Sequence, residues 1–116
     1  MLCGDVRWMQ FGPGHVGESS GRRPAVIVSN NGANGAAARR GKGVVTVVPL
    51  TTNTDVVHRF QVLLPAEACG LPETSKAQVE QIRALAVGRV GPRMGTVPPH
   101  LMREIDEALR LHLALG

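Results

Sequence analysis

Residues 44–53, VVTVVPLTTN, contain the strongest strand pattern in the chain. Residues 44–50 form a short β-branched apolar run, which favours a buried strand. The run is too short, and too interrupted by Thr46 and Pro49, to cross a membrane. Hydroxyl and amide side chains follow at 51–54 and predict that the strand ends there in a turn. The expected result is a buried strand with polar groups at its end.

Further short strands are expected on both sides of this one. Residues 6–11 contain Trp8 and Phe11, and the run at 25–29 is typical of a strand buried on both faces. Residues 60–64, FQVLL, are expected to form another strand that ends at Pro65. Several short strands with one terminal helix predict a mainly β (α+β) fold, either a small barrel or a strongly bent sheet.

The connections are rich in glycine. Gly12, Pro13 and Gly14 open a predicted loop that runs to residue 21. Residues 30–42, NNGANGAAARRGK, predict a basic loop in which residues 36–40 also fit one helical turn, and residues 67–74 predict a turn region. Pro98 and Pro99 suit the first turn of an amphipathic helix. Its apolar stripe is predicted at four positions spaced by four: Leu101, Ile105, Leu109 and Leu113.

Residues 75–87, SKAQVEQIRALAV, fit two different structures. Helix propensity favours a helix with Val79, Ile82 and Ala86 on one face. A strand instead places Ala77, Val79 and Gln81 on one side. The pattern alone does not decide between the two.

The length, composition and net charge of the chain limit the class of protein. A chain of 116 residues with 43% apolar residues predicts one globular domain, residues 1–116. The net charge of +4 favours a polyanionic partner or simply aids solubility. Because the chain has one tryptophan, two phenylalanines and no tyrosine, base stacking is not expected to be the main means of holding a nucleic acid.

Cys3 and Cys69 are isolated and have no ligand-like spacing to the four histidines. They predict two reduced thiols, with a disulfide less favoured and a zinc site least favoured. The N-terminal residues MLCGDVRW have neither a charged leader nor an apolar signal core. The expected location is the cytoplasm.

Five motifs in chain order resemble a known family: GDVRWMQFGP, GRRPAVIVSN, VVTVVPLTTN, FQVLLP and EQIR. At these spacings the chain, from about residue 4 to residue 115, resembles the MazF/PemK toxins of bacterial toxin–antitoxin pairs. The resemblance implies a small SH3-like barrel with short helices, a homodimer, and cleavage of single-stranded RNA at short sequences without metal or other cofactor. It also implies a MazE-like cognate antitoxin whose disordered tail covers the RNA groove, and it places EQIR on a strand.

Metal-free RNA cleavage uses the neighbouring 2′-hydroxyl and leaves a 2′,3′-cyclic phosphate and a 5′-hydroxyl. It requires a base, a cation that neutralises the phosphorane, and donors that orient the phosphate. Arg23 suits the cationic role because its guanidinium forks across two phosphate oxygens; the alternative is a solvated charge at a strand entrance. The resemblance makes Thr51 a hydroxyl donor to the same phosphate and Glu18 the base, an exposed loop carboxylate being the alternative for Glu18.

The remaining candidates are expected to bind RNA. Arg22 is either a phosphate contact or a solvated charge, and Thr52 and Asn53 are either RNA contacts or ordinary turn residues. By resemblance, three residues line the RNA groove and contact base edges: Glu80, Gln81 and Arg83. A cross-strand salt bridge is the alternative for Glu80 or Arg83. Ser19, also an RNA-binding candidate, stands where the family's Gly-Ser-Glu-Gln loop carries glutamine, and Gly17 replaces its serine.

Two rival functions use the same barrel. A CcdB-like toxin binds DNA gyrase without cutting RNA, and an inactive paralogue would only bind an antitoxin or RNA. Arg23, Thr51 and Glu18 together favour the nuclease, because a gyrase binder needs none of them. A histidine-dependent mechanism, in which His15 of the active loop assists, is the less favoured alternative.

Overall fold

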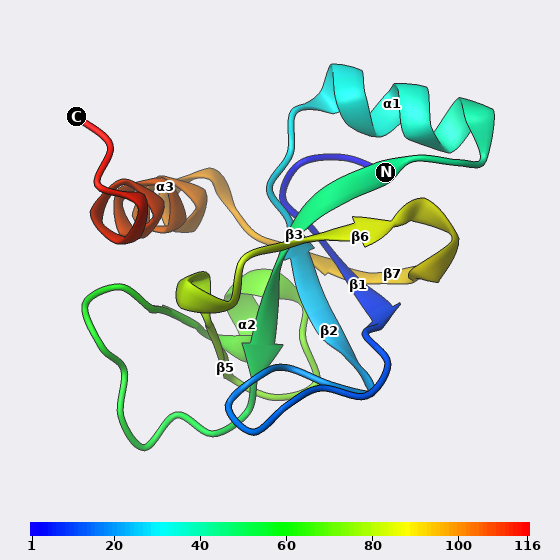
Figure 1. The fold of residues 1–116 in the computed structure, drawn as a ribbon. Coiled ribbons are helices and arrows are strands. Elements are labelled where there is room, and N and C mark those ends of the chain that lie inside the picture. Colours follow the sequence, from blue (N-terminus) through cyan, green and yellow to red (C-terminus); the bar gives the residue numbers. More distant parts are fainter.

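Strand β3 (Val44–Thr51) is the central strand of the fold, as its sequence predicts. The computed structural model describes residues 1–116, and β3 runs through the middle of it (Figure 1). β3 pairs antiparallel with β2 on one side and with β5 and β6 on the other. The elements in chain order are β1 (Asp5–Gln10), β2 (Arg22–Ile27), α1 (Asn31–Arg40), β3, β4 (Val62–Leu64), α2 (Ala66–Cys69), β5 (Ser75–Ala77), the 3₁₀ helix η1 (Val79–Gln81), β6 (Arg83–Ala86), the 3₁₀ helix η2 (Val87–Arg89), β7 (Val90–Thr96) and α3 (Pro99–Leu113).

The strands form one antiparallel sheet in the order β4-β5-β3-β2-β1-β7, with β6 paired to β3 as a branch. The sheet bends into a half-barrel, and α1 and α3 lie at its periphery (Figure 1). The predicted fold class, mainly β with short helices and a C-terminal helix, is confirmed. No helix is both long enough and apolar enough to cross a membrane.

β2 and β3 are buried on both faces and divide the core in two. Successive side chains of a strand point to opposite faces, so Val26 packs into one cluster while Ala25 and Ile27 pack into the other. The first cluster includes Val48, Leu50 and the buried side of α3, and the second includes Phe11, Val47 and Leu85. The short β-branched runs therefore reflect burial on both sides, as predicted.

α3 begins at the predicted prolines, and its first three turns pack on the first cluster. Leu101, Ile105 and Ala108 are buried and Leu109 is half-buried. The prediction for Leu113 is wrong, because its side chain is 47% exposed where the helix extends beyond the core.

The basic loop predicted at residues 30–42 is instead the ten-residue helix α1. The Asn30 side chain caps it by accepting a hydrogen bond from the Ala33 N–H at 2.8 Å, and Gly41 ends it in the left-handed conformation. Inside the helix, the buried Asn34 side chain donates to the Ser29 carbonyl at 2.8 Å. Capping and this buried amide stabilise a helix whose glycines and asparagines have poor propensity.

Residues 75–87 are neither a helix nor one continuous strand. β5 pairs Ala77 with Leu50, whereas β6 pairs Arg83 with Val47, so the chain advances six positions while β3 advances three. The extra residues form the 3₁₀ helix η1 between the two strands. The strand predicted for EQIR is therefore correct for Arg83 and wrong for Glu80 and Gln81, which lie in η1.

Two elements have no counterpart in the predictions. β7 pairs with β1 along the edge of the sheet, with two irregularities in its register. α2 is a single turn inside the region predicted as turns. Gly95 of β7 lies so close to α2 that a Cβ there would be 2.2 Å from the Cys69 carbonyl oxygen. Cys69 is buried and Cys3 exposed, and both are free thiols, as predicted.

Candidate active site

Arg23 and Thr51 lie on neighbouring strands at the same end of the sheet. The β2–β3 register pairs Val26 with Val48 and Ala25 with Pro49. This pairing begins at Ala25 and Pro49, so Arg23 and Thr51 each lie two residues beyond it, at the start of β2 and the end of β3. Both are half-buried, and strand alternation directs both side chains to the face of the second cluster.

The Arg23 guanidinium is held at one nitrogen and free at the other two. Its Nε donates to the Ser20 carbonyl at 3.1 Å. No carboxylate neutralises it, because the only ion pair in the structure joins Glu107 and Arg110. A fixed cation with two unused N–H-bearing nitrogens is suited to an anionic group such as a phosphate.

The Thr51 hydroxyl is oriented by the turn that follows β3. Its Oγ1 accepts a hydrogen bond from the Asn53 N–H at 3.2 Å, and the Asn53 side chain accepts one from the Asp55 N–H at 3.3 Å. Since the Thr51 oxygen acts as acceptor here, its proton stays free to be donated. The amide oxygen of Asn53 stabilises the turn, while Thr52 is exposed beside it.

The loop at residues 12–21 carries Glu18 and lies at the same end of the sheet as the end of β3 (Figure 1). It is closed at its base, where Phe11 donates to the Gly21 carbonyl and Gly21 to the Gly12 carbonyl, each at 2.8 Å. Glu18 is exposed, and its Oε1 accepts a long hydrogen bond of 3.3 Å from the His15 N–H. The carboxylate is free of ion pairs, as a general base must be.

Gln81 fastens this loop to η1. Its Oε1 accepts from the Ser19 N–H at 3.2 Å, and its Nε2 donates to the Gly17 carbonyl. Both ends of the Gln81 amide are therefore occupied by the loop. Ser19 is only 5% exposed, and its buried Oγ has no hydrogen-bond partner. In this conformation the loop shields Ser19, so an RNA contact by Ser19 or Gln81 requires the loop to shift.

Glu80 and Arg83 flank Gln81 in different environments. The Glu80 Oε2 accepts from the buried Gln61 amide at 2.7 Å, while its Oε1 is buried without a partner. The exposed Arg83 guanidinium lies 5.2 Å from the centre of the Phe11 ring, a cation–π distance. Neither residue forms the cross-strand salt bridge considered as the alternative.

Sequence reasoning missed two supporting residues. Gln61 holds Glu80 and also accepts from the His58 N–H at 3.1 Å, so it connects the loop before β4 to η1. Phe11, predicted only as part of a strand, lies beneath Arg83. A glutamine inside the apolar run FQVLL was the available clue to Gln61. Nothing in the pattern indicated the role of Phe11.

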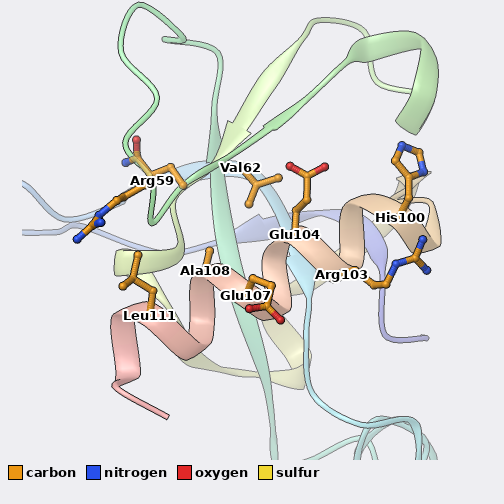
Figure 2. Close-up of a pocket in the computed structure, with 9 residues that line it drawn as sticks. Arg59, Val62, His100, Arg103, Glu104, Glu107, Ala108 and Leu111 are labelled. Atoms are coloured by element: carbon orange, nitrogen blue, oxygen red, sulfur yellow. The ribbon is translucent and has the colours of Figure 1, made fainter. Parts of the chain in front are cut away.

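The widest concave surfaces lie elsewhere. A hollow of about 630 Å³ lies between α3 and the segment that enters β4, lined by Arg59, Glu104 and Leu111 among others (Figure 2). None of the candidate catalytic or RNA-binding residues lines it. No three histidine, cysteine or acidic side chains lie close enough together to form a metal site.

Residues 2–113 match the family model described as PemK-like, MazF-like toxin of type II toxin–antitoxin systems. The chain belongs to this family. Endoribonuclease MazF9 of Mycobacterium tuberculosis is 46% identical over 115 residues, which cover 99% of this chain and 98% of that protein. Endoribonuclease MazF6 of the same species is 31% identical over 112 residues, 96% of this chain and 95% of that one. The chain is thus a homologue of MazF endoribonucleases.

Solved structures of MazF-family proteins share the fold. An endoribonuclease from Mycobacterial species, in complex with its cognate antitoxin, matches with a TM-score of 0.78 at 28% identity, over 100% of this chain and 97% of that one. MazF from Deinococcus radiodurans matches with a TM-score of 0.79 at 24% identity, over 98% and 96% of the two chains. The half-barrel with its C-terminal helix is therefore the MazF fold.

Proposed function

We propose that this chain is a sequence-specific endoribonuclease that cuts single-stranded mRNA, and that it acts as the toxin of a toxin–antitoxin module. The observation that supports the proposal is that Arg23 and Thr51 lie at the same end of two neighbouring strands, where the loop that carries the exposed Glu18 carboxylate also lies. A cation, a hydroxyl donor and a base are the three groups that 2′-hydroxyl attack on phosphate requires. The relatives named as endoribonucleases support the same reaction class.

In the proposed reaction the 2′-oxygen attacks the adjacent phosphorus as Glu18 takes its proton. The new 2′-O–P bond gives a pentacoordinate phosphorane, whose charge Arg23 neutralises with its two free nitrogens while the Thr51 hydroxyl donates a hydrogen bond to a phosphate oxygen. The bond from phosphorus to the 5′-oxygen then breaks, and that oxygen leaves as a hydroxyl by taking a proton from a water molecule. The proton held on Glu18 neutralises the resulting hydroxide and restores the carboxylate. The products are a 2′,3′-cyclic phosphate and a 5′-hydroxyl.

The proposal includes two protein partners. One is a second copy of this chain in a homodimer, and the other is a MazE-like antitoxin. The endoribonuclease from Mycobacterial species was solved with its cognate antitoxin, which supports the second. Light scattering of the purified chain tests the first, and a mass near twice 12.3 kDa is expected. Inhibition of RNA cleavage by the co-expressed antitoxin tests the second.

The decisive experiment incubates the purified chain with a long single-stranded RNA in EDTA and sequences the ends. We expect defined fragments with 5′-hydroxyl ends, produced by the wild type and absent with Arg23→Ala. Intact RNA would overturn the proposal. Inhibition of gyrase supercoiling without RNA cleavage would favour the CcdB-like alternative instead.

A further inference from the structure

Positive charge is concentrated in one part of the chain. The first 50 residues contain six of the 13 lysines and arginines but only two of the nine acidic residues, so they account for the whole net charge of +4. One of those two acids, Asp5, is buried and accepts a hydrogen bond from the Leu2 N–H. Residues 81–93 add three arginines and no carboxylate. Three of the six cations of the first 50 residues lie on β1 and β2 (Arg7, Arg22 and Arg23), and the other three lie on or just after α1. The strands β1, β2, β6 and β7 therefore carry an excess of positive charge, which favours a polyanionic partner.

A hollow of about 310 Å³ lies within this basic region, where the end of β1 and the start of β2 meet η2 and β7. Its lining includes Trp8, Gln10, Arg22, Gly88, Arg89 and Gly91. None of these residues belongs to the catalytic set Arg23, Thr51 and Glu18. Figure 1 shows the connection between β6 and β7 on the same side of the fold as the end of β1. Gly88 and Arg89 of η2, in this connection, line the hollow.

The two arginines of the hollow are oriented but not neutralised. The Arg22 guanidinium carbon lies 4.7 Å from the centre of the Trp8 ring, a cation–π distance, and Arg22 is otherwise exposed. The Arg89 Nη1 donates to the Gln10 carbonyl at 3.3 Å, and Gln10 is also the cross-strand partner of Arg22. Neither arginine forms an ion pair. Both keep N–H groups for an anion.

Glycines shape the wall of the hollow. A Cβ at Gly91 would lie 2.8 Å from the Trp8 carbonyl oxygen, so β7 can approach Trp8 this closely only without a side chain. A Cβ at Gly88 would meet nothing within 4 Å, so the space in front of η2 is open. Arg22 and Arg89 are themselves exposed, so a ligand can reach both from solvent.

We propose that the Arg22–Arg89 hollow binds one nucleotide of the RNA substrate outside the catalytic pair, with its phosphate on Arg89 and its base stacked on the outer face of the Arg22 guanidinium. Unpaired RNA bases stack on guanidinium planes as well as on aromatic rings. Arg22 opens β2 and directly precedes Arg23, and their side chains leave the strand on opposite faces. An RNA strand that crosses this end of β2 meets the hollow and the catalytic pair in succession. The inference rests on the proposed endoribonuclease function.

Trp8 makes the site observable. It is the only tryptophan, and the chain has no tyrosine, so its fluorescence comes from a position beside Arg22. The probe is a 2′-O-methyl RNA oligonucleotide with the sequence that the wild type cuts, because it lacks the nucleophile and stays intact. Titrating it into the wild-type protein is expected to change Trp8 emission with the same midpoint as the anisotropy of the labelled oligonucleotide.

Arg89→Ala tests the phosphate contact. The control is Arg103→Ala, which also removes one exposed arginine but lies on α3, outside the hollow. Loss of a charge-assisted phosphate contact is expected to weaken binding about tenfold. It should also make the dependence of log affinity on log salt shallower by about 0.7, the value for one phosphate of a single strand. Arg103→Ala should change neither quantity. Arg22→Ala should weaken binding and also abolish most of the Trp8 response.

The outcomes separate this site from the proposed function. If the wild type cuts RNA, but Arg89→Ala matches Arg103→Ala and Trp8 emission ignores the oligonucleotide, the hollow is not a nucleotide site and the nuclease proposal stands. If the wild type neither binds nor cuts RNA, both proposals fail. Weaker binding and a shallower salt dependence with Arg89→Ala, together with a Trp8 response in the wild type, establish the site.

Discussion

Gln81 accepts a hydrogen bond at 3.2 Å from the backbone N–H of Ser19, which joins η1 to the loop that carries Glu18. Its other end donates to the Gly17 carbonyl. Gln81 therefore bridges the two positions next to the proposed base. This arrangement makes Gln81 a positioning residue, whereas the family resemblance implies that it contacts RNA directly.

Gln81→Ala distinguishes the two roles. If Gln81 positions the loop, its removal displaces Glu18, and a misplacement near 1 Å costs about 10²-fold in the cleavage rate. The loop at residues 12–21 should then be cut faster in limited proteolysis. A change in sequence preference with the proteolysis rate unaltered would contradict the positioning role. Gln81→Glu, which keeps the acceptor for Ser19 but loses the donor to Gly17, should fall between the wild type and Gln81→Ala.

Arg23→Ala and Arg22→Ala should have different effects. Arg23 lies at the same end of the sheet as Thr51 and has two free nitrogens, so its loss should lower the single-turnover rate by about 10²–10³-fold, as expected for a group that stabilises charge only in the transition state. Arg22 stacks on Trp8 away from that face, so Arg22→Ala should mainly raise the RNA concentration needed for half-maximal rate. Both should unfold near the wild-type denaturant midpoint. Equal losses in rate and binding would refute the distinction.

Thr51→Val tests the hydroxyl group of Thr51, because it replaces the hydroxyl by a methyl group and leaves the shape of the side chain nearly unchanged. The hydrogen bond proposed to orient the phosphate is lost, and cleavage should slow by about 10²-fold. The Asn53 N–H also loses its acceptor, but residue 53 is exposed and water replaces the bond, so stability should change little. Thr51→Ser retains the hydroxyl and should keep most of the activity. A Thr51→Val enzyme as fast as Thr51→Ser would exclude the hydroxyl from the reaction.

The sequence predicted elements whose pattern is local. The β-branched runs of β2 and β3 and the prolines of α3 are such cases. The prediction from the sequence failed for α1. This helix depends on the Asn30 cap and on the hydrogen bond from Asn34 to the Ser29 carbonyl, and helix propensity does not take such contacts into account. β7 was also missed, because Gly91, Pro92 and Gly95 are untypical of a strand and are tolerated here at the edge of the sheet.

The candidate site was predicted as a set of residues but not as an arrangement. Arg23 and Thr51 were selected from their residue types and the family motifs, while their position at one end of the sheet follows from the antiparallel β2–β3 pairing, which no single motif fixes. The link between Gln81 and Ser19 spans 62 positions, and the support of Glu80 by Gln61 spans 19. Such contacts depend on the 3₁₀ helix η1 that connects β5 to β6, and the sequence pattern does not predict this helix.

Gly95→Ala should destabilise the fold. The added Cβ would lie 2.2 Å from the Cys69 carbonyl oxygen, so β7 or α2 must move, and overpacking of this kind costs about 1–3 kcal/mol. Gly88→Ala is the matched control, because its Cβ meets no atom within 4 Å. Urea unfolding of both variants measures the difference. Equal midpoints for the two variants would mean that β7 adapts without cost.

Stability should fall at alkaline pH, in part because of Cys69. Burial raises the pKa of its thiol above the usual value of about 8.5, so the folded chain still holds this proton when the unfolded chain has lost it. The unfolded state then binds fewer protons, and the free energy of unfolding decreases as the pH rises above about 8.5. Below that pH the thiol is neutral in both states, and Cys69 makes its full contribution to the free energy of unfolding. Urea unfolding from about pH 7 to about pH 10 should show a flatter decline for Cys69→Ala than for the wild type; parallel declines would exclude the thiol as a cause.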